Sequence, residues 1–373
     1  MAAVSNSVVH LTMRFGSTVL SFGTGVLYER GGQHFIITAW HNVTGLHSET
    51  LKHLNKNLGV PDNVVANIVV NWRGVGSRRI PIALPLADEE KTLFCIHPQN
   101  WPRVDVVAIP FDPMADHPLV GATSNGEMIS GCICLLDMGS TGVPAEICPV
   151  QKYLVPNKDV AQRWLDTVEV TEELFIPGYP HNVQDYCAQP VWKRATIASS
   201  VQDGWNGEPK FLVDSASQSG MSGSPVLYYS PNGVVRTMGI TNQFSQDVAI
   251  LAGIYVGRVG VKEDADPQIG TVWNQSVINE IIDGKCYERL PAEIEVSPRE
   301  LEAAVREALS SWSREGLENV RNPQLPSRYY VQGQVMKQIG GRASPQRVLD
   351  AALEMANSYD GPSSPAKASS SDR

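Results

Sequence analysis

The sequence predicts an all-β core of antiparallel strands, arranged as a sandwich or a barrel, with helices after it. Between about residue 7 and about residue 260, short apolar runs rich in β-branched and aromatic residues alternate with turn signals such as Glu29-Arg-Gly-Gly and Ser230-Pro-Asn-Gly. Strands and helices do not alternate regularly here, which argues against a doubly wound parallel sheet. The 31 glycines and 25 prolines fit an architecture with many turns.

The expected strands are runs of strand length that turn residues bound on both sides. They lie at 17–22, 25–28, 34–38, 67–72, 104–109, 174–180, 195–198, 210–214, 225–229 and 251–257. Helical spacing appears later, first at 272–282. Ser297-Pro-Arg-Glu then forms a capping box, followed by an apolar stripe of Leu301, Val305 and Leu309. Ser344-Pro-Gln-Arg opens another amphipathic helix, and residues 322–327 form a linker between the two.

Composition excludes several classes of function. The formal net charge is −9, the wrong sign for a phosphate-binding surface, so nucleic acid is not an expected partner. No apolar stretch is long enough to span a membrane, and the N-terminus does not resemble a signal peptide. The six cysteines are scattered without a Cys-x-x-Cys pair, which favours buried free thiols over a zinc site. Together these features predict a cytoplasmic protein.

Ser219-Gly-Met-Ser-Gly-Ser-Pro-Val is the segment most indicative of chemistry. A nucleophilic serine needs an exposed hydroxyl on a tight turn, and glycines before and after Ser222 permit such a turn. The N–H groups of Gly220 and Ser222 would then form an oxyanion hole. The alternative is a glycine- and serine-rich turn without catalytic function.

Two further segments supply a base and an acid. Phe35-Ile-Ile-Thr-Ala-Trp-His41 is a strand that ends in a histidine, and Val104-Asp105-Val-Val-Ala-Ile places an aspartate among apolar residues. A buried carboxylate needs hydrogen bonds, and a histidine ring would supply one. The carboxylate would in turn fix the tautomer of that imidazole ring. The alternatives are a histidine satisfied within a turn and an aspartate that faces water.

Chain order restricts which triad these residues can form. Every histidine lies at or before His181, so none follows Ser222, and the order Ser, acid, His of the α/β-hydrolases is excluded. No aspartate precedes His41, which excludes the subtilisin order for this histidine. The order His41, Asp105, Ser222 remains, as in trypsin-like enzymes.

The chain resembles the trypsin-like peptidases of the chymotrypsin superfamily, and most closely their bacterial intracellular members, over about residues 7 to 285. The resemblance is carried by an ordered set of short matches. These are Gly23-Thr-Gly-Val-Leu, Thr38-Ala-Trp-His41, Asp105-Val-Val-Ala-Ile, Gly178-Tyr-Pro, Gly220-Met-Ser-Gly-Ser-Pro and Gly253-Ile-Tyr-Val-Gly, with a final helix around Trp273 to Ile282.

This resemblance implies two six-stranded antiparallel β-barrels at 7–285, a helical C-terminal extension at 286–360 and a disordered tail at 361–373. It also implies a serine endopeptidase that acts on proteins or peptides through His41, Asp105 and Ser222, with no metal or cofactor. Ala216 and Ser217 would form the floor of the specificity pocket, and Tyr255, Val256 and Gly257 its walls. Without a carboxylate at Ala216, a preference for Arg or Lys is not expected. Two interpretations of Arg258 stay open: a solvated arginine at a strand end, or a residue at the pocket rim that favours an acidic side chain.

Three departures from the family pattern bear on activity. Met221 replaces an aspartate that pairs with a newly cut N-terminus in secreted relatives, so activation by N-terminal cleavage is not expected. Asn42 replaces a cysteine, and Ser224 replaces a glycine. Two alternative functions stay open: a protease-like module that binds peptides without cleaving them, and an adaptor whose C-terminal helices recruit partners. In a protease, these helices would either dock or regulate the enzyme or pack on the barrel.

Overall fold

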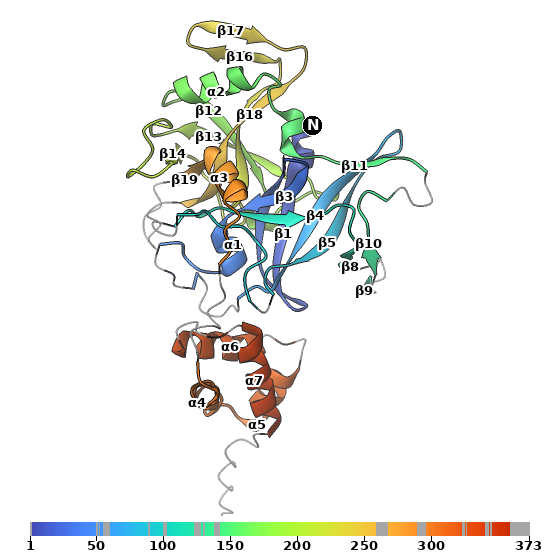
Figure 1. Ribbon diagram of the computed structural model, residues 1–373, viewed down its shortest axis with the longest axis vertical. Helices are drawn as coiled ribbons and strands as arrows, with labels where there is room; N and C mark the ends of the chain where they lie inside the picture. Colours follow the sequence, from blue (N-terminus) through green and yellow to red (C-terminus); the bar gives the residue numbers. More distant parts are fainter. Residues whose placement is uncertain are drawn as a thin grey trace, which may run out of the picture. The chain divides into compact units, whose positions relative to one another are not determined.

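A computed structural model describes residues 2–49, 51, 53–54, 60–88, 90–99, 103–122, 128–129, 131–137, 142–258, 268–288, 296–322, 325, 327–339, 343 and 345–358 (Figure 1). The chain divides into two compact units. The first comprises Met1–Lys52 and Pro61–Glu288, and the second His53–Val60 and Arg289–Arg373. The domain limits 7–285 and 286–360 stay predictions, and the tail predicted at 361–373 lies outside the described residues.

A seven-stranded antiparallel sheet forms the N-terminal part of the first unit. Its strand order is β11 (Ala145–Ile147), β4 (Asn63–Trp72), β1 (Val8–Phe15), β2 (Thr18–Arg30), β3 (Gln33–Thr38) and β6 (Val107–Phe111), with β5 (Gly76–Pro85) paired to β4. Alternate residues of each strand point to one face, so Val9, Leu11 and Met13 of β1 enter one apolar core. The sheet stands where the sequence predicts the first six-stranded barrel.

The C-terminal part of the first unit is a closed barrel of six antiparallel strands. Around the barrel these are β12 (Glu173–Gly178), β13 (Val191–Ile197), β14 (Lys210–Asp214), β19 (Ile269–Asn274), β18 (Val248–Arg258) and β15 (Ser224–Ser230). The hairpin of β16 (Val234–Thr237) and β17 (Ile240–Gln243) lies between β15 and β18 in sequence. The structure thus confirms a mostly β unit with one closed six-stranded barrel.

Further short elements complete the first unit. Strand β7 (His117–Pro118) pairs with β10 (Cys132–Ile133), and β8 (Gly121–Ala122) pairs with β9 (Met128–Ile129). Short 3-10 helices are η1 (Ala3–Ser7), η3 (Val150–Tyr153) and η4 (Pro180–Asn182). Helix α2 (Lys158–Thr167) begins at Asn157, whose side chain caps the first turn.

An apolar cluster joins the sheet to the barrel. Ile37 of β3, Leu227 of β15 and Ile254 of β18 pack in it together with Ile278 of helix α3 (Ser276–Gly284). The prediction of a helix from residue 272 was partly wrong, because Val272 and Trp273 belong to β19 and the helix begins at Ser276. The apolar spacing of 272–282 continues from a buried strand into a helix, and periodicity alone does not separate the two.

The second unit contains four helices among its described residues: α4 (Pro298–Leu309), α5 (Arg314–Arg321), α6 (Ser327–Gln338) and α7 (Pro345–Ser358). Ser297 caps α4 by accepting a hydrogen bond from the Glu300 N–H at 3.2 Å, as the capping box predicts. The predicted stripe of Leu301, Val305 and Leu309 is buried in a core that these helices share. The stripe is therefore covered within its own unit, and docking of a protein partner stays a prediction.

The sequence also led to predictions about the cysteines and about membrane-spanning segments. All six cysteines are free, but only Cys95 and Cys148 are buried, whereas Cys132 and Cys187 are exposed. The expectation of buried thiols was therefore wrong for the last two. Within the described part of the chain, every helix is too short or too polar to cross a bilayer.

Candidate active site

His41 and Asp105 are brought together by the pairing of two strands. Strand β3 ends at Thr38, and the one-turn helix α1 (Trp40–Thr44) follows and ends at Gly45, whose φ is +69°. Thr38 pairs with Val107 at the start of β6, so the residues just before β6 lie beside α1. The Trp40 N–H donates to the Asp105 carbonyl at 3.2 Å, which extends this pairing to the site.

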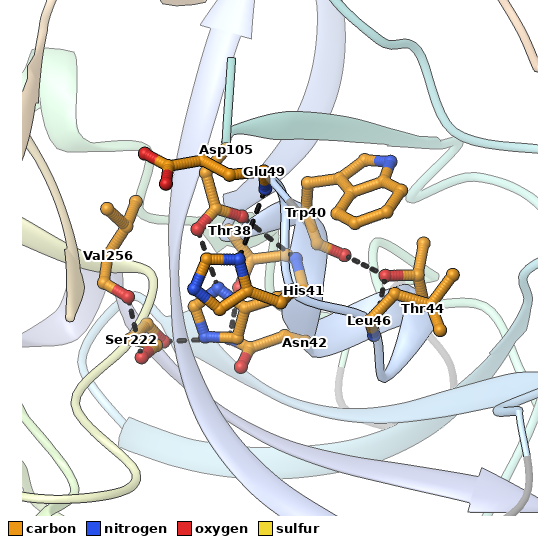
Figure 2. Close-up of polar contacts among 11 residues, drawn as sticks. Thr38, Trp40, His41, Asn42, Thr44, Leu46, Glu49, Asp105, Ser222 and Val256 are labelled. Carbon is orange, nitrogen blue, oxygen red and sulfur yellow. Dashed lines mark hydrogen bonds and ion pairs between the residues drawn. The ribbon is translucent and has the colours of Figure 1, made fainter. Parts of the chain in front are cut away.

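The Asp105 carboxylate accepts two hydrogen bonds from His41. The main-chain N–H of His41 donates to Oδ1 at 3.0 Å, and ring Nδ1 lies 2.8 Å from Oδ2 (Figure 2). Asp105 is 7% exposed, so the carboxylate is largely removed from water. Because an ionised carboxylate only accepts, Nδ1 carries the proton, and Nε2 of the neutral ring is left as an acceptor.

The protonation of His41 follows from the same two features. Burial lowers the pKa of the imidazole, but the charge of Asp105 and its hydrogen bond raise it, and the net direction is upward from 6.5. The imidazolium is therefore stabilised in place, as a general base requires once it has taken a proton.

Ser222 lies in a turn whose shape depends on the flanking glycines. Gly220 and Gly223 have φ values of +92° and +89°, a region that residues with a side chain seldom adopt. A Cβ at Gly223 would overlap the carbonyl oxygen of Thr24, and one at Gly220 would overlap that of Tyr179. Replacement of either glycine would therefore move the turn that carries Ser222.

Hydrogen bonds from the seven-stranded sheet hold the main chain of this turn. The Ser222 carbonyl accepts from the Thr24 N–H at 3.0 Å and from the Asn42 side-chain amide at 2.8 Å. The Thr24 hydroxyl donates to the Gly220 carbonyl at 2.8 Å. Asn42 follows His41 directly in the chain, so the residue after His41 holds the main chain of Ser222 in place (Figure 2).

The hydroxyl of Ser222 takes part in a different contact from the one expected. Ser222 is half-buried, and its Oγ donates to the Val256 carbonyl of β18 at 3.1 Å. Among the described residues, the hydrogen bonds of the site join His41 to Asp105 and Ser222 to Val256, and they do not join Oγ to the imidazole. The structure therefore brings the three residues to one place with the serine hydroxyl turned toward β18.

The two donors of the predicted oxyanion hole have no hydrogen-bond acceptor in the part of the chain that the structure describes. Neither the Gly220 N–H nor the Ser222 N–H has an acceptor among the described residues, whereas the Met221 N–H between them donates to Gln218. Met221 is itself fully buried in the barrel core. Two amides with one residue between them, neither of them paired within the described chain, match the donor pair that the sequence predicts for an oxyanion hole.

The predicted pocket residues lie in two segments beside Ser222. Ala216 is exposed, whereas Ser217 is fully buried and its hydroxyl contacts the hydroxyl of Tyr255. Val256 is buried, and Gly257 is half-buried with a φ of +148°. Arg258 is half-buried at the end of β18.

Sequence reasoning missed the residues that position the serine. Thr24 and Thr38 are fully buried, and the Thr38 hydroxyl links them by donating to the Thr24 carbonyl at 2.7 Å while it accepts from Asn42 at 3.0 Å. A buried threonine between two glycines in Gly23-Thr-Gly was the available signal, since a buried hydroxyl needs partners. The Val256 carbonyl left no signal, because every residue carries one.

Metal ligation finds no support in the described part of the chain. No group of three or more His, Cys, Asp or Glu side chains gathers there in a way that would hold an ion.

Comparisons with known proteins give matches at the level of structure. No protein-family model matches the chain, and no curated protein matches it. The active form of the Rv3671c protease of M. tuberculosis is 14% identical, with 77% of this chain and 84% of that one covered and a TM-score of 0.36. Its inactive form is also 14% identical, with 76% of this chain and 91% of that one covered and a TM-score of 0.34. A serine endoprotease of Yersinia pestis is 13% identical, with 75% of this chain and 62% of that one covered and a TM-score of 0.36.

The solved structures that the chain is similar to are thus described as a protease of M. tuberculosis and a serine endoprotease of Yersinia pestis. The low identities and TM-scores do not transfer the activity or the substrates of those proteins to this chain.

Proposed function

We propose that the chain is a serine endopeptidase in which Ser222 is the nucleophile, His41 the general base and Asp105 the residue that orients it. The observation that carries this proposal is the pair of hydrogen bonds between His41 and Asp105, at 2.8 and 3.0 Å, beside a serine turn fixed by Asn42. A buried carboxylate bound to both the ring and the main chain of one histidine fixes the tautomer that a base needs. We also propose that the seven-stranded sheet and the closed barrel correspond to the two barrels of a chymotrypsin-like fold.

The proposed reaction begins with rotation of the Ser222 hydroxyl from the Val256 carbonyl toward Nε2 of His41. The serine Oγ then bonds to the peptide carbonyl carbon while its proton moves to Nε2, and Asp105 stabilises the imidazolium. The N–H groups of Gly220 and Ser222 bind the oxyanion. The C–N bond breaks as the imidazolium gives its proton to the leaving amine, and water hydrolyses the acyl-enzyme by the same steps.

Labelling with a fluorophosphonate tests this proposal without knowledge of the substrate. The probe reacts with activated serines, so the wild-type chain should be labelled and Ser222→Ala should not. Ser219→Ala is the matched control, because Ser219 is exposed in the same turn and should leave labelling unchanged. A proteomic cleavage-site profile of the wild type and Ser222→Ala would then report peptide hydrolysis. Equal cleavage by both chains would refute the assignment.

The hydrogen bond from Ser222 Oγ to the Val256 carbonyl favours a second candidate function. A serine hydroxyl held in that position does not donate to Nε2 of His41 and is therefore not activated. The chain would then be a peptide-binding module with a protease-like structure. Absence of labelling, together with retention of peptides by the intact chain, would favour this candidate over the peptidase.

A further inference from the structure

The space next to Ser222 lies between two segments of the barrel. The first is the chain at 216–220, which leads into the serine turn. The second is the end of β18, where the Tyr255 carbonyl accepts from the Gly223 N–H at 2.7 Å and the Val256 carbonyl accepts from Ser222 Oγ at 3.1 Å. If the proposed peptidase function holds, the side chain that precedes the cleaved bond must enter between these segments, because both adjoin the nucleophile.

The Tyr255 side chain packs in the barrel core and reaches from β18 to the first of these segments. Its side chain is 1% exposed and is one of the largest fully buried side chains in the described chain. At its far end the phenol hydroxyl contacts the hydroxyl of Ser217, which is 0% exposed. The ring therefore spans from β18 to the segment that the sequence predicted as the pocket floor.

The same hydroxyl end of the ring also lies close to strand β19. It lies against Gly270 of β19, where an added Cβ would overlap the ring carbon Cε2. The hydroxyl end of the ring is thus held between a buried hydroxyl and a backbone that carries no side chain, within a close-packed core. Entry of a large side chain would require the ring to leave a fully buried site and would separate two buried hydroxyls.

We propose that Tyr255 and Ser217 close the specificity pocket, so that the peptidase cleaves after small uncharged residues such as Gly, Ala or Ser. The proposal rests on the proposed function and adds the substrate class to it. Steric exclusion sets the preference, because a bulky side chain and the phenol ring compete for one volume. A cationic side chain is also disfavoured, since Tyr255 and Ser217 offer hydroxyls and no negative charge.

The test uses peptidyl phosphonates that react with an activated serine and differ only at the residue before the phosphorus: Ala, Phe or Arg. The wild-type chain should react with the Ala probe about 100-fold faster than with the Phe or Arg probe. Tyr255→Val, which removes the ring, should raise the rate with the Phe probe at least about tenfold relative to the Ala probe. Tyr255→Phe keeps the ring and should keep the preference for Ala.

Tyr228→Val serves as the matched control. Tyr228 is on β15 of the same barrel, where its ring packs against Trp164 at 4.9 Å between centroids, and its replacement should leave the order of the three probes unchanged. If Tyr255→Val fails to fold, as circular dichroism would show, the wild-type order of probes still decides the question.

A fluorophosphonate without a peptide separates the two ways of failing. If it labels Ser222 while the wild-type chain reacts fastest with the Phe or Arg probe, the closed pocket is overturned and the peptidase stands. If neither probe type labels the chain, both proposals fail. Fast labelling by the fluorophosphonate and by the Ala probe supports both.

Discussion

Replacement of Asp105 by asparagine tests whether this residue holds His41 in the tautomer that accepts a proton at Nε2. Asp105 accepts from the His41 main-chain N–H at Oδ1 and from Nδ1 at Oδ2. An asparagine has only one oxygen, and the main-chain N–H can do nothing except donate. The oxygen therefore stays with the main chain, and the amide NH2 group faces Nδ1. Nδ1 must then accept, which places the ring proton on Nε2, where it blocks transfer from Ser222.

The magnitude follows from the population of the wrong tautomer. In Ser-His-Asp enzymes the same exchange lowers the rate about 10⁴-fold, which corresponds to about 5 kcal/mol at 1.36 kcal/mol per factor of ten. We expect the rate of fluorophosphonate labelling to fall by about this factor in Asp105→Asn. Asp203→Asn, at an exposed position, should leave the rate unchanged. A rate for Asp105→Asn within about tenfold of the wild type would refute the tautomer reasoning.

The pH profile of labelling gives an independent check. Labelling needs the neutral imidazole, so the rate should rise with pH, and its midpoint in the wild type should lie above 6.5 because the pKa of His41 is raised. Asp105→Asn removes the charge that raises this pKa and leaves burial, which lowers it. The midpoint of the residual labelling should therefore move below that of the wild type. An unchanged midpoint would contradict the contribution of Asp105.

Three further changes test the surrounding structure. Thr24→Val should destabilise the fold by about 2–6 kcal/mol, because it leaves the buried Gly220 carbonyl and Tyr179 N–H without the Thr24 hydroxyl; an unchanged urea midpoint would contradict this. Burial, opposed in part by Asn182, lowers the pKa of His10, so its stabilising effect is present above about pH 6.5 and is lost as the pH falls below that value. The fall in unfolding free energy from pH 7 to pH 5 should accordingly be smaller in His10→Gln, and an equal fall would count against the assignment. Leu309→Ala should destabilise the helical unit by about 2–5 kcal/mol in calorimetry while Ser222 labelling persists; loss of labelling would show that the helices support the site.

Local patterns in the sequence predicted several strands and the three proposed catalytic residues, but not β1 or β5, and the run predicted at 104–109 is a strand only from Val107. The apolar run at 34–38 and the segment at 210–214 became β3 and β14, because each is bounded by turn residues. The turn around Ser222 was recognisable since its glycines adopt conformations that other residues avoid. Chain order then selected His41 and Asp105, and the structure places their side chains 2.8 Å apart.

Features set by distant contacts were not predictable. Strand β18 (Val248–Arg258) is apolar throughout most of its length, so alternation does not reveal that Tyr255 points inward toward Ser217. Helix α5 escaped notice because only Leu317 and Val320 are buried among its mostly polar residues. Helix α6 lacks a regular apolar stripe, and the fully buried Gln332 interrupts the pattern.

The hydrogen bonds between the N-terminal sheet and the serine turn have a consequence for folding during synthesis. The hydroxyl of Thr24 meets its acceptor 196 positions later, and Asn42 meets the Ser222 carbonyl 180 positions later. Contacts of such separation form only after the intervening polypeptide has been synthesised and folded. A ribosome-bound fragment that ends before the barrel closes would therefore lack a positioned nucleophile. If the proposed function holds, peptidase activity would appear only when the barrel is complete. Incomplete chains on the ribosome would then not cleave one another.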